Sequence, residues 1–108
     1  MTQSNIFSDI PQNLPDELIS IIQKQEHIHI ERIVSKGHTT PLGEWYDQNQ
    51  NEWVLIIQGH ATLRLIDDQI IDLNKGDYYF IPAHLKHRVE WTTPDYETIW
   101  LAIYFSAS

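Results

Sequence analysis

Hydrophobic and polar residues alternate with a period of two along most of the chain, which is the spacing of half-buried β-strands. The alternation begins at residues 27–35, and the segment 98–105 is apolar on both faces, as expected of a strand that is covered on both sides. Turn-forming residues separate the other extended segments, which are residues 44–48, 53–57, 61–66, 69–73, 77–81 and 87–91. About eight short strands in one small chain predict an all-β antiparallel sandwich or barrel.

One hairpin is specified by its turn. Segments 61–66 and 69–73 are separated only by Asp67 and Asp68, and two strands joined by two such residues form a tight antiparallel pair. We therefore expect these two segments to be neighbours in one sheet.

The N-terminal segment departs from the period of two. Asn13 and Pro15, followed by two acidic residues, are typical of a helix start. Apolar residues then recur at helical spacing, at Leu14, Leu18, Ile21 and Ile22. We expect a short amphipathic helix over residues 15–24 that packs on the β-scaffold, and we divide the chain into an arm with this helix (residues 1–27) and a β-barrel domain (residues 28–108).

The composition excludes several functions. The chain has 108 residues, seven basic against fifteen acidic, and a net charge of -8. This charge argues against binding nucleic acid or an anionic membrane surface, because both rely on clustered Lys and Arg. There is no cysteine, so thiolate catalysis and cysteine-based metal sites are excluded. No signal peptide and no apolar run near ~20 residues is present, and we expect a cytoplasmic protein.

Candidate chemistry gathers at the corner between segments 77–81 and 87–91. Pro82 ends one strand, His84 and His87 follow, and alternation places His87 and Trp91 on one mostly apolar face. A histidine on such a face is either a core residue with a satisfied hydrogen bond or part of a site. The pattern leaves both interpretations open.

The first strand segment carries a second set of polar residues. Arg32 falls in an apolar row, where it either points into a pocket and binds an anionic substrate group or pairs with a carboxylate; a bulge that shifted the register would instead turn it to water. His27 and His29 share the more polar face. We expect that face to point to solvent, the alternative being that these two histidines form a metal pair.

Two spacings along the chain resemble the two motifs of the cupin superfamily of small β-barrels. Glu52 precedes Gly59 by seven positions, while Gly76, Pro82 and His87 follow in the order and spacing of the second motif. The sequence segments 44–48 and 82–91 are similar to the corresponding segments of small single-domain cupins. The resemblance implies an antiparallel jelly-roll, or double-stranded β-helix, barrel.

The resemblance also implies a metal site, which this chain matches only in part. Cupin ligands are two histidines and a glutamate from the first motif and one histidine from the second. Glu52 and His87 occupy two of these positions, but Tyr46 and Gln48 stand where the first two histidines are expected. Gln48 and His84 are the remaining candidate ligands for a divalent Fe, Mn, Ni or Zn ion, and the metal site is accordingly partly degenerate.

We therefore expect a small-molecule site at the barrel mouth, built around Glu52 and His87. A carboxylate beside an imidazole forms an acid/base pair, because each group tunes the pKa of the other. Further candidate ligand-binding residues are Tyr46, Gln48, Trp91 and Arg32. The alternatives are a metal-dependent enzyme of the dioxygenase or isomerase type, and a non-catalytic homodimer that buries the apolar strand 98–105.

Overall fold

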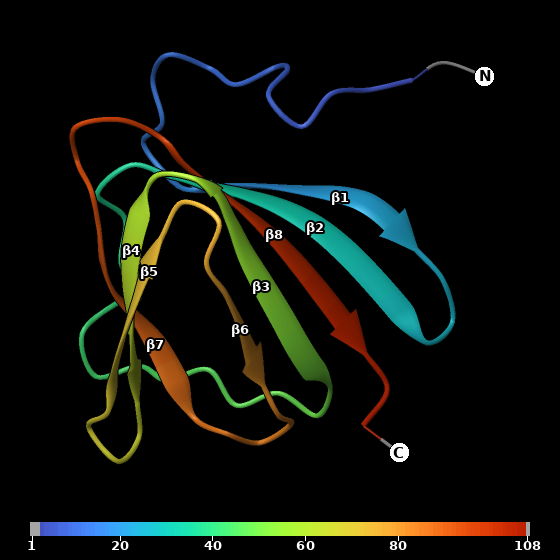
Figure 1. The fold of residues 1–108 in the computed structure, drawn as a ribbon, viewed down its shortest axis with the longest axis vertical. Helices are drawn as coiled ribbons and strands as arrows, with labels where there is room; N and C mark the ends of the chain where they lie inside the picture. The colour runs from blue at the N-terminus through green and yellow to red at the C-terminus, as the bar shows by residue number, and fades with distance from the viewer. Residues whose placement is uncertain (1–2, 108) are drawn as a thin grey trace.

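The chain folds into two facing antiparallel β-sheets, as a computed structural model that describes residues 3–107 shows (Figure 1). The larger sheet has the strand order β1-β2-β8-β3-β6 and the smaller one β5-β4-β7. The strands are β1 (Leu18–Lys24), β2 (Ile28–Ser35), β3 (Asn51–Gln58), β4 (His60–Leu65), β5 (Ile70–Asn74), β6 (Tyr78–Ile81), β7 (His87–Thr92) and β8 (Thr98–Phe105). The all-β prediction is confirmed. No helix that could cross a membrane occurs in residues 3–107.

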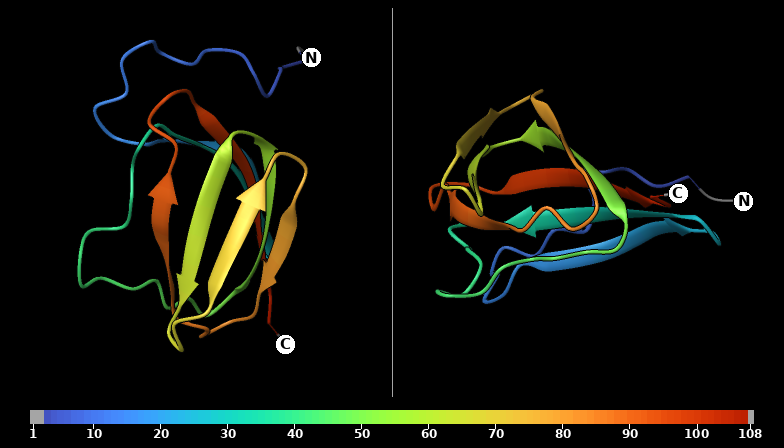
Figure 2. Two further views of the ribbon diagram at one scale, coloured as in Figure 1. Left: turned by 60° about the vertical axis from the view of Figure 1, so that its left-hand side comes forward. Right: turned by 90° about the horizontal axis from the view of Figure 1, so that it is seen from below.

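The core lies between the two sheets, which face each other in both views of Figure 2. It is made by inward-facing residues of both sheets: Val54, Ile56, Ala61, Leu63, Leu73, Ile81, Trp100 and Ala102. Strand β8 lies between β2 and β3, and its Trp100 and Ala102 face the core, whereas Ile103 and Phe105 on its outer face are only partly buried. The hairpin predicted across Asp67 and Asp68 is present as β4 and β5.

The predicted helix at residues 15–24 is wrong, because residues 18–24 form β1. This strand pairs with β2 along its length, so the sheet begins within the segment we assigned to the arm and helix. Ile21 pairs with Glu31 and Gln23 with Ile30, which leaves Ile22 as the extra residue of a β-bulge. The bulge accounts for two adjacent isoleucines in a strand, and this adjacency is what suggested helical spacing. A free edge of β2 supplies backbone partners that a helix of about ten residues cannot match, since short helices are marginal in water.

The extended segment 44–48 is also not a strand. It forms one isolated bridge, between Tyr46 and His87, within a long connection from β2 to β3. The chain still has eight strands among the described residues, since β1 takes the place that the sequence gave to segment 44–48.

The turn between β3 and β4 requires glycine. Gly59 has φ +101°, and a Cβ atom there would lie 2.4 Å from Thr98 Oγ1 and 2.6 Å from Thr98 Cα. The backbone of β8 therefore passes where any side chain would project.

We expect Gly59→Ala to lower the free energy of unfolding by about 3 kcal/mol or more, because backbone strain and overpacking add. Gly76→Ala is the matched control: its φ is +89° but nothing lies within 4 Å, so only strain of about 1–2 kcal/mol applies. Urea denaturation of both variants measures the difference. Equal losses would contradict the close approach to β8.

Candidate functional site

Glu52 and His87 meet between the two sheets. Glu52 faces inward from β3 of the larger sheet and is 6% exposed, and His87 begins β7 of the smaller sheet and is 4% exposed. Glu52 Oε1 lies 3.5 Å from His87 Nε2. Two residues 35 positions apart in the sequence thus form one buried pair, as the sequence predicted.

A backbone hydrogen bond on the side away from Glu52 fixes the orientation of the His87 ring. Its Nδ1 lies 2.9 Å from the carbonyl oxygen of Leu85, to which it donates, and this leaves Nε2 to face Glu52. Burial acts to lower the pKa of His87, but the neighbouring Glu52 carboxylate and the hydrogen bond to Leu85 outweigh it, so this pKa is raised from 6.5. The imidazolium is therefore favoured beside the carboxylate.

Glu52 retains unused capacity to accept hydrogen bonds. The 3.5 Å separation from His87 is longer than a normal N–H···O bond, and Oε1 is buried with no hydrogen-bond partner among the described residues. A buried carboxylate oxygen without a partner is costly. This oxygen is thus the strongest indication of a bound group at the site.

A cavity of about 120 Å³ surrounds the pair. The polar residues that line it are Glu17, Glu31, Tyr46, Gln48, Glu52, His87 and Tyr104. The apolar residues that line it are Ile19, Ile33, Val54, Leu63, Val89 and Trp100. Tyr46, Gln48, Glu52 and His87 therefore converge, as predicted. The volume is below the ~300–1,000 Å³ of drug-sized sites, so a ligand of few heavy atoms or one end of a larger one fits.

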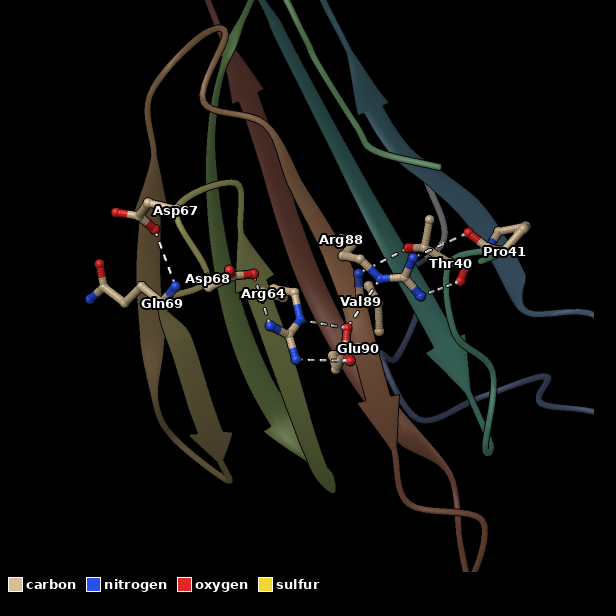
Figure 3. Close-up of polar contacts among 9 residues, drawn as sticks. All are labelled: Thr40, Pro41, Arg64, Asp67, Asp68, Gln69, Arg88, Val89 and Glu90. Atoms are coloured by element: carbon tan, nitrogen blue, oxygen red, sulfur yellow. Dashed lines mark hydrogen bonds and ion pairs between the residues drawn. The ribbon is translucent and has the colours of Figure 1, made fainter. Parts of the chain in front are cut away.

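The connection that carries Tyr46 and Gln48 is fastened to β7. Tyr46 N donates to His87 O at 2.8 Å, and His87 N donates to Tyr46 O at 3.1 Å. Figure 3 shows the neighbouring attachment, in which the Arg88 guanidinium donates to the carbonyl oxygens of Thr40 and Pro41. Arg88 thus acts on the opposite side of β7 from the cavity, where it positions the wall that Tyr46 forms.

A bulge on β7 decides which side chains reach the cavity. Leu63 pairs with Val89 and Thr62 with Trp91, so Glu90 is the extra residue. Its carboxylate forms ion pairs with Arg64 at 3.2 Å and Arg88 at 3.1 Å (Figure 3). The hydrogen bond from Arg64 is the main reason that the pKa of Glu90 is lowered.

The bulge turns Trp91 out of the apolar row that strict alternation predicted. Trp91 is 40% exposed, and its ring lies edge-on to His60, with 5.1 Å between centroids. It does not line the cavity.

Arg32 and His84 also lie elsewhere. The Arg32 guanidinium donates to the carbonyl oxygens of Ile6 and Ser8, so it holds the N-terminal arm against the outer face of the larger sheet. The His84 side chain is 70% exposed and its Nδ1 lies 3.0 Å from Asp47 Oδ1. Neither residue reaches the cavity.

Three polar residues of the site escaped the sequence analysis. Glu17 was assigned to a helix start, and Glu31 to a solvent-facing row of β2, yet both line the cavity. Tyr104 was interpreted only as part of an apolar strand. The alternation in β2 was visible, but the sequence contains no signal for which of its two faces points inward.

The two phenols are held in the protonated form. Burial, followed by the charges of Glu52 and Glu31, raises the pKa of Tyr104 strongly. Burial, followed by the charge of Glu17, raises the pKa of Tyr46. Both side chains are therefore hydrogen-bond donors in the cavity at neutral pH.

Comparison with known proteins agrees with this architecture. A family model described as the cupin domain matches residues 31–104, which span both sheets and the cavity. The chain belongs to the cupin superfamily. A search of curated proteins finds no match.

Solved structures of other cupins superpose closely. A candidate mannose-6-phosphate isomerase from Ralstonia eutropha JMP134 is 37% identical with a TM-score of 0.94, over 99% of this chain and 100% of that one. A cupin superfamily protein from Desulfitobacterium hafniense DCB-2 is 22% identical with a TM-score of 0.74, over 90% of this chain and 84% of that one. An RmlC-like cupin with a double-stranded β-helix fold from Methanocaldococcus jannaschii is 18% identical with a TM-score of 0.71, over 92% and 88% of the two chains. The predicted fold is confirmed.

The residues at the cupin ligand positions do not fit a transition metal. They offer one imidazole, one carboxylate, the amide of Gln48 and the Tyr46 phenol, whose raised pKa disfavours the phenolate that a metal would bind. Within residues 3–107 no three His, Cys, Asp or Glu side chains are grouped so that they could hold a metal ion. His84, the expected substitute ligand, is paired with Asp47 instead.

We expect His87 to make stability depend on pH. Because its pKa is raised in the folded state, the stability it contributes is complete below 6.5 and is lost as the pH rises through the folded-state value, at about 1.4 kcal/mol for each pKa unit. The difference in unfolding free energy between wild type and His87→Gln should shrink as the pH rises above 6.5 and through the raised folded-state pKa. Denaturation at several pH values measures it.

His27→Gln is the control, because the side chain of His27 is 76% exposed. It should show the same pH dependence as the wild type. A constant difference between wild type and His87→Gln would contradict the raised pKa.

Proposed function

We propose that this cupin binds a small molecule in the cavity around Glu52 and His87. The carrying observation is the buried Glu52 Oε1, which faces this cavity without a hydrogen-bond partner among the described residues. A donor on a ligand would satisfy that oxygen and offset its burial.

The pair is suited to moving a proton. With Nδ1 held by Leu85, His87 exchanges a proton only at Nε2, and Glu52 stabilises the charged imidazolium. A ligand group between Glu52 and His87 would therefore meet a base or an acid according to pH. The phenol of Tyr104 and the amide of Gln48 are placed to orient it. We propose acid/base chemistry on this basis, in a protein that we expect to be cytoplasmic.

The mannose-6-phosphate isomerase activity suggested for the Ralstonia relative is not easily assigned to this chain. A sugar phosphate carries a dianionic group, and proteins bind such groups with Arg, Lys or backbone N–H groups. No Arg or Lys lines this cavity, and three of its side chains are carboxylates. We therefore do not assign a phosphorylated sugar to this chain.

The proposal predicts ligand-dependent stabilisation that requires both residues. A metabolite that binds, found by screening a library of small metabolites, should raise the melting temperature of the wild type. At 100-fold excess over Kd it should increase the free energy of unfolding by about 2.7 kcal/mol. Glu52→Gln and His87→Ala should fold and lose this response, while Glu26→Gln, which changes an exposed carboxylate, should keep it. A response unchanged in both site variants would refute the proposal.

The alternative of a metal-dependent enzyme is tested on the same protein, purified without a histidine tag. The donor set favours a metal content well below one equivalent, and no stabilisation by Fe(II), Mn(II), Ni(II) or Zn(II). A stoichiometric metal that is lost in Glu52→Gln and His87→Ala would favour the alternative instead.

We also propose a homodimer through the outer face of β8, β3 and β6. Trp53 packs on Tyr78 and Phe80 on Phe105 there, and Tyr78 and Phe80 are 67% and 47% exposed. The register leaves no charged residue pointing outward from these three strands. In a chain of net charge -8, a second copy meets least repulsion at such a face.

Light scattering at micromolar concentration should give twice the mass of the chain. Phe80→Lys should give the single mass, because it places a charge in the interface. A monomeric wild type would remove the support for this face.

A further inference from the structure

The cavity is negatively charged, and this restricts what the proposed site accepts. Glu17, Glu31 and Glu52 line it, and His87 is the basic residue of the lining. His29, next to the cavity, lies 3.0 Å from Glu31. The three carboxylates thus face at most two imidazolium ions.

The carboxylates differ in what they already bind. Glu17 accepts a hydrogen bond from Ser35 Oγ at 3.2 Å, and Glu31 has His29 beside it. Glu52 has the long contact to His87 and the Tyr104 phenol beside it, but its Oε1 is buried without a hydrogen-bond partner in the described part of the chain. Glu52 is therefore the carboxylate that is open to a ligand.

The nearby arginines do not change this balance. Arg32 is held by the N-terminal arm, and Arg88 by the connection at Thr40 and by Glu90. Both guanidinium groups are on the outer sides of their sheets. Neither can neutralise an anion inside the cavity.

The apolar part of the lining suits a short hydrocarbon group. Val54, Leu63 and Val89 come from three strands, and the aromatic rings of Trp100 and Tyr104 also line the space. Ring faces attract cations as well as covering alkyl groups. A volume of about 120 Å³ holds a cationic head with a short alkyl chain.

We propose that the ligand of this site is a small organic cation, an ammonium or guanidinium compound, whose N–H groups donate to Glu52 Oε1. The inference rests on the proposed function and names its ligand class. The raised pKa values of Tyr46 and Tyr104 agree with it, because neighbouring carboxylates contribute to both. Binding of the cation would favour the neutral form of His87.

Four probes of similar size separate the classes: n-propylammonium, n-propanol, propionate and inorganic phosphate. Each is titrated into the full chain, and backbone amide NMR shifts of cavity residues are followed. We expect n-propylammonium to bind at least about tenfold more tightly than n-propanol, since a charge-assisted bond replaces a neutral one. Propionate and phosphate should give no saturable shifts.

Two variants locate the charge that matters. Glu52→Gln should weaken n-propylammonium by about tenfold and leave n-propanol unchanged. Glu31→Gln removes another lining carboxylate and should weaken n-propylammonium binding less. It provides the same comparison if Glu52→Gln folds poorly. Glu26→Gln should change nothing.

The outcomes separate the ligand class from the existence of the site. Equal binding of n-propanol and n-propylammonium, tighter binding of either anion, or no cavity shifts with n-propylammonium would each overturn the cation proposal. Glu52-dependent stabilisation by a neutral or anionic metabolite in the library screen would then leave the proposed function standing. If no metabolite in the library gave Glu52-dependent stabilisation, both the cation proposal and the proposed function would be refuted.

Discussion

The structure depends on one costly arrangement, a carboxylate buried between two sheets with an imidazole as its nearest charged partner. Glu52 belongs to β3 of the larger sheet and His87 to β7 of the smaller one, so the pair exists only when both sheets have formed. Their separation of 3.5 Å gives attraction without a good hydrogen bond. The cavity beside them is where a ligand, as we propose, would satisfy the remaining hydrogen-bonding capacity of Glu52.

The long connection between β2 and β3 completes the site, and contacts that lie outside the cavity hold this connection in place. Arg88 and the hydroxyl of Thr40 fasten the connection to the outer side and edge of β7, and the bridge between Tyr46 and His87 is a second attachment of the same connection. A frame shared with other cupins thus carries a different set of polar groups. At the two positions where the resemblance implies imidazoles, this chain has the phenol of Tyr46 and the amide of Gln48, which are suited to hydrogen bonding.

The failures of the sequence analysis have a common cause. Helical spacing at residues 18–22 was produced by a bulge in β1, and the expected row of His87 and Trp91 was interrupted by a bulge at Glu90. A bulge inserts one residue and reverses the facing of those beyond it. The polar face of β2 was expected in solvent for a related reason: the period of two separates two faces, but only the position of the second sheet tells which one is inside.

The sequence by itself determined the all-β fold, the β4–β5 hairpin and the meeting of Tyr46, Gln48, Glu52 and His87, because alternation, turn residues and motif spacing are local or nearly local signals. Only the tertiary structure decided that Glu17, Glu31 and Tyr104 join them and that Trp91, Arg32 and His84 do not. Those placements depend on bulges, on strand order and on which backbone carbonyl a guanidinium reaches. Each is a contact between distant segments, and its energy exists only once the two sheets face each other.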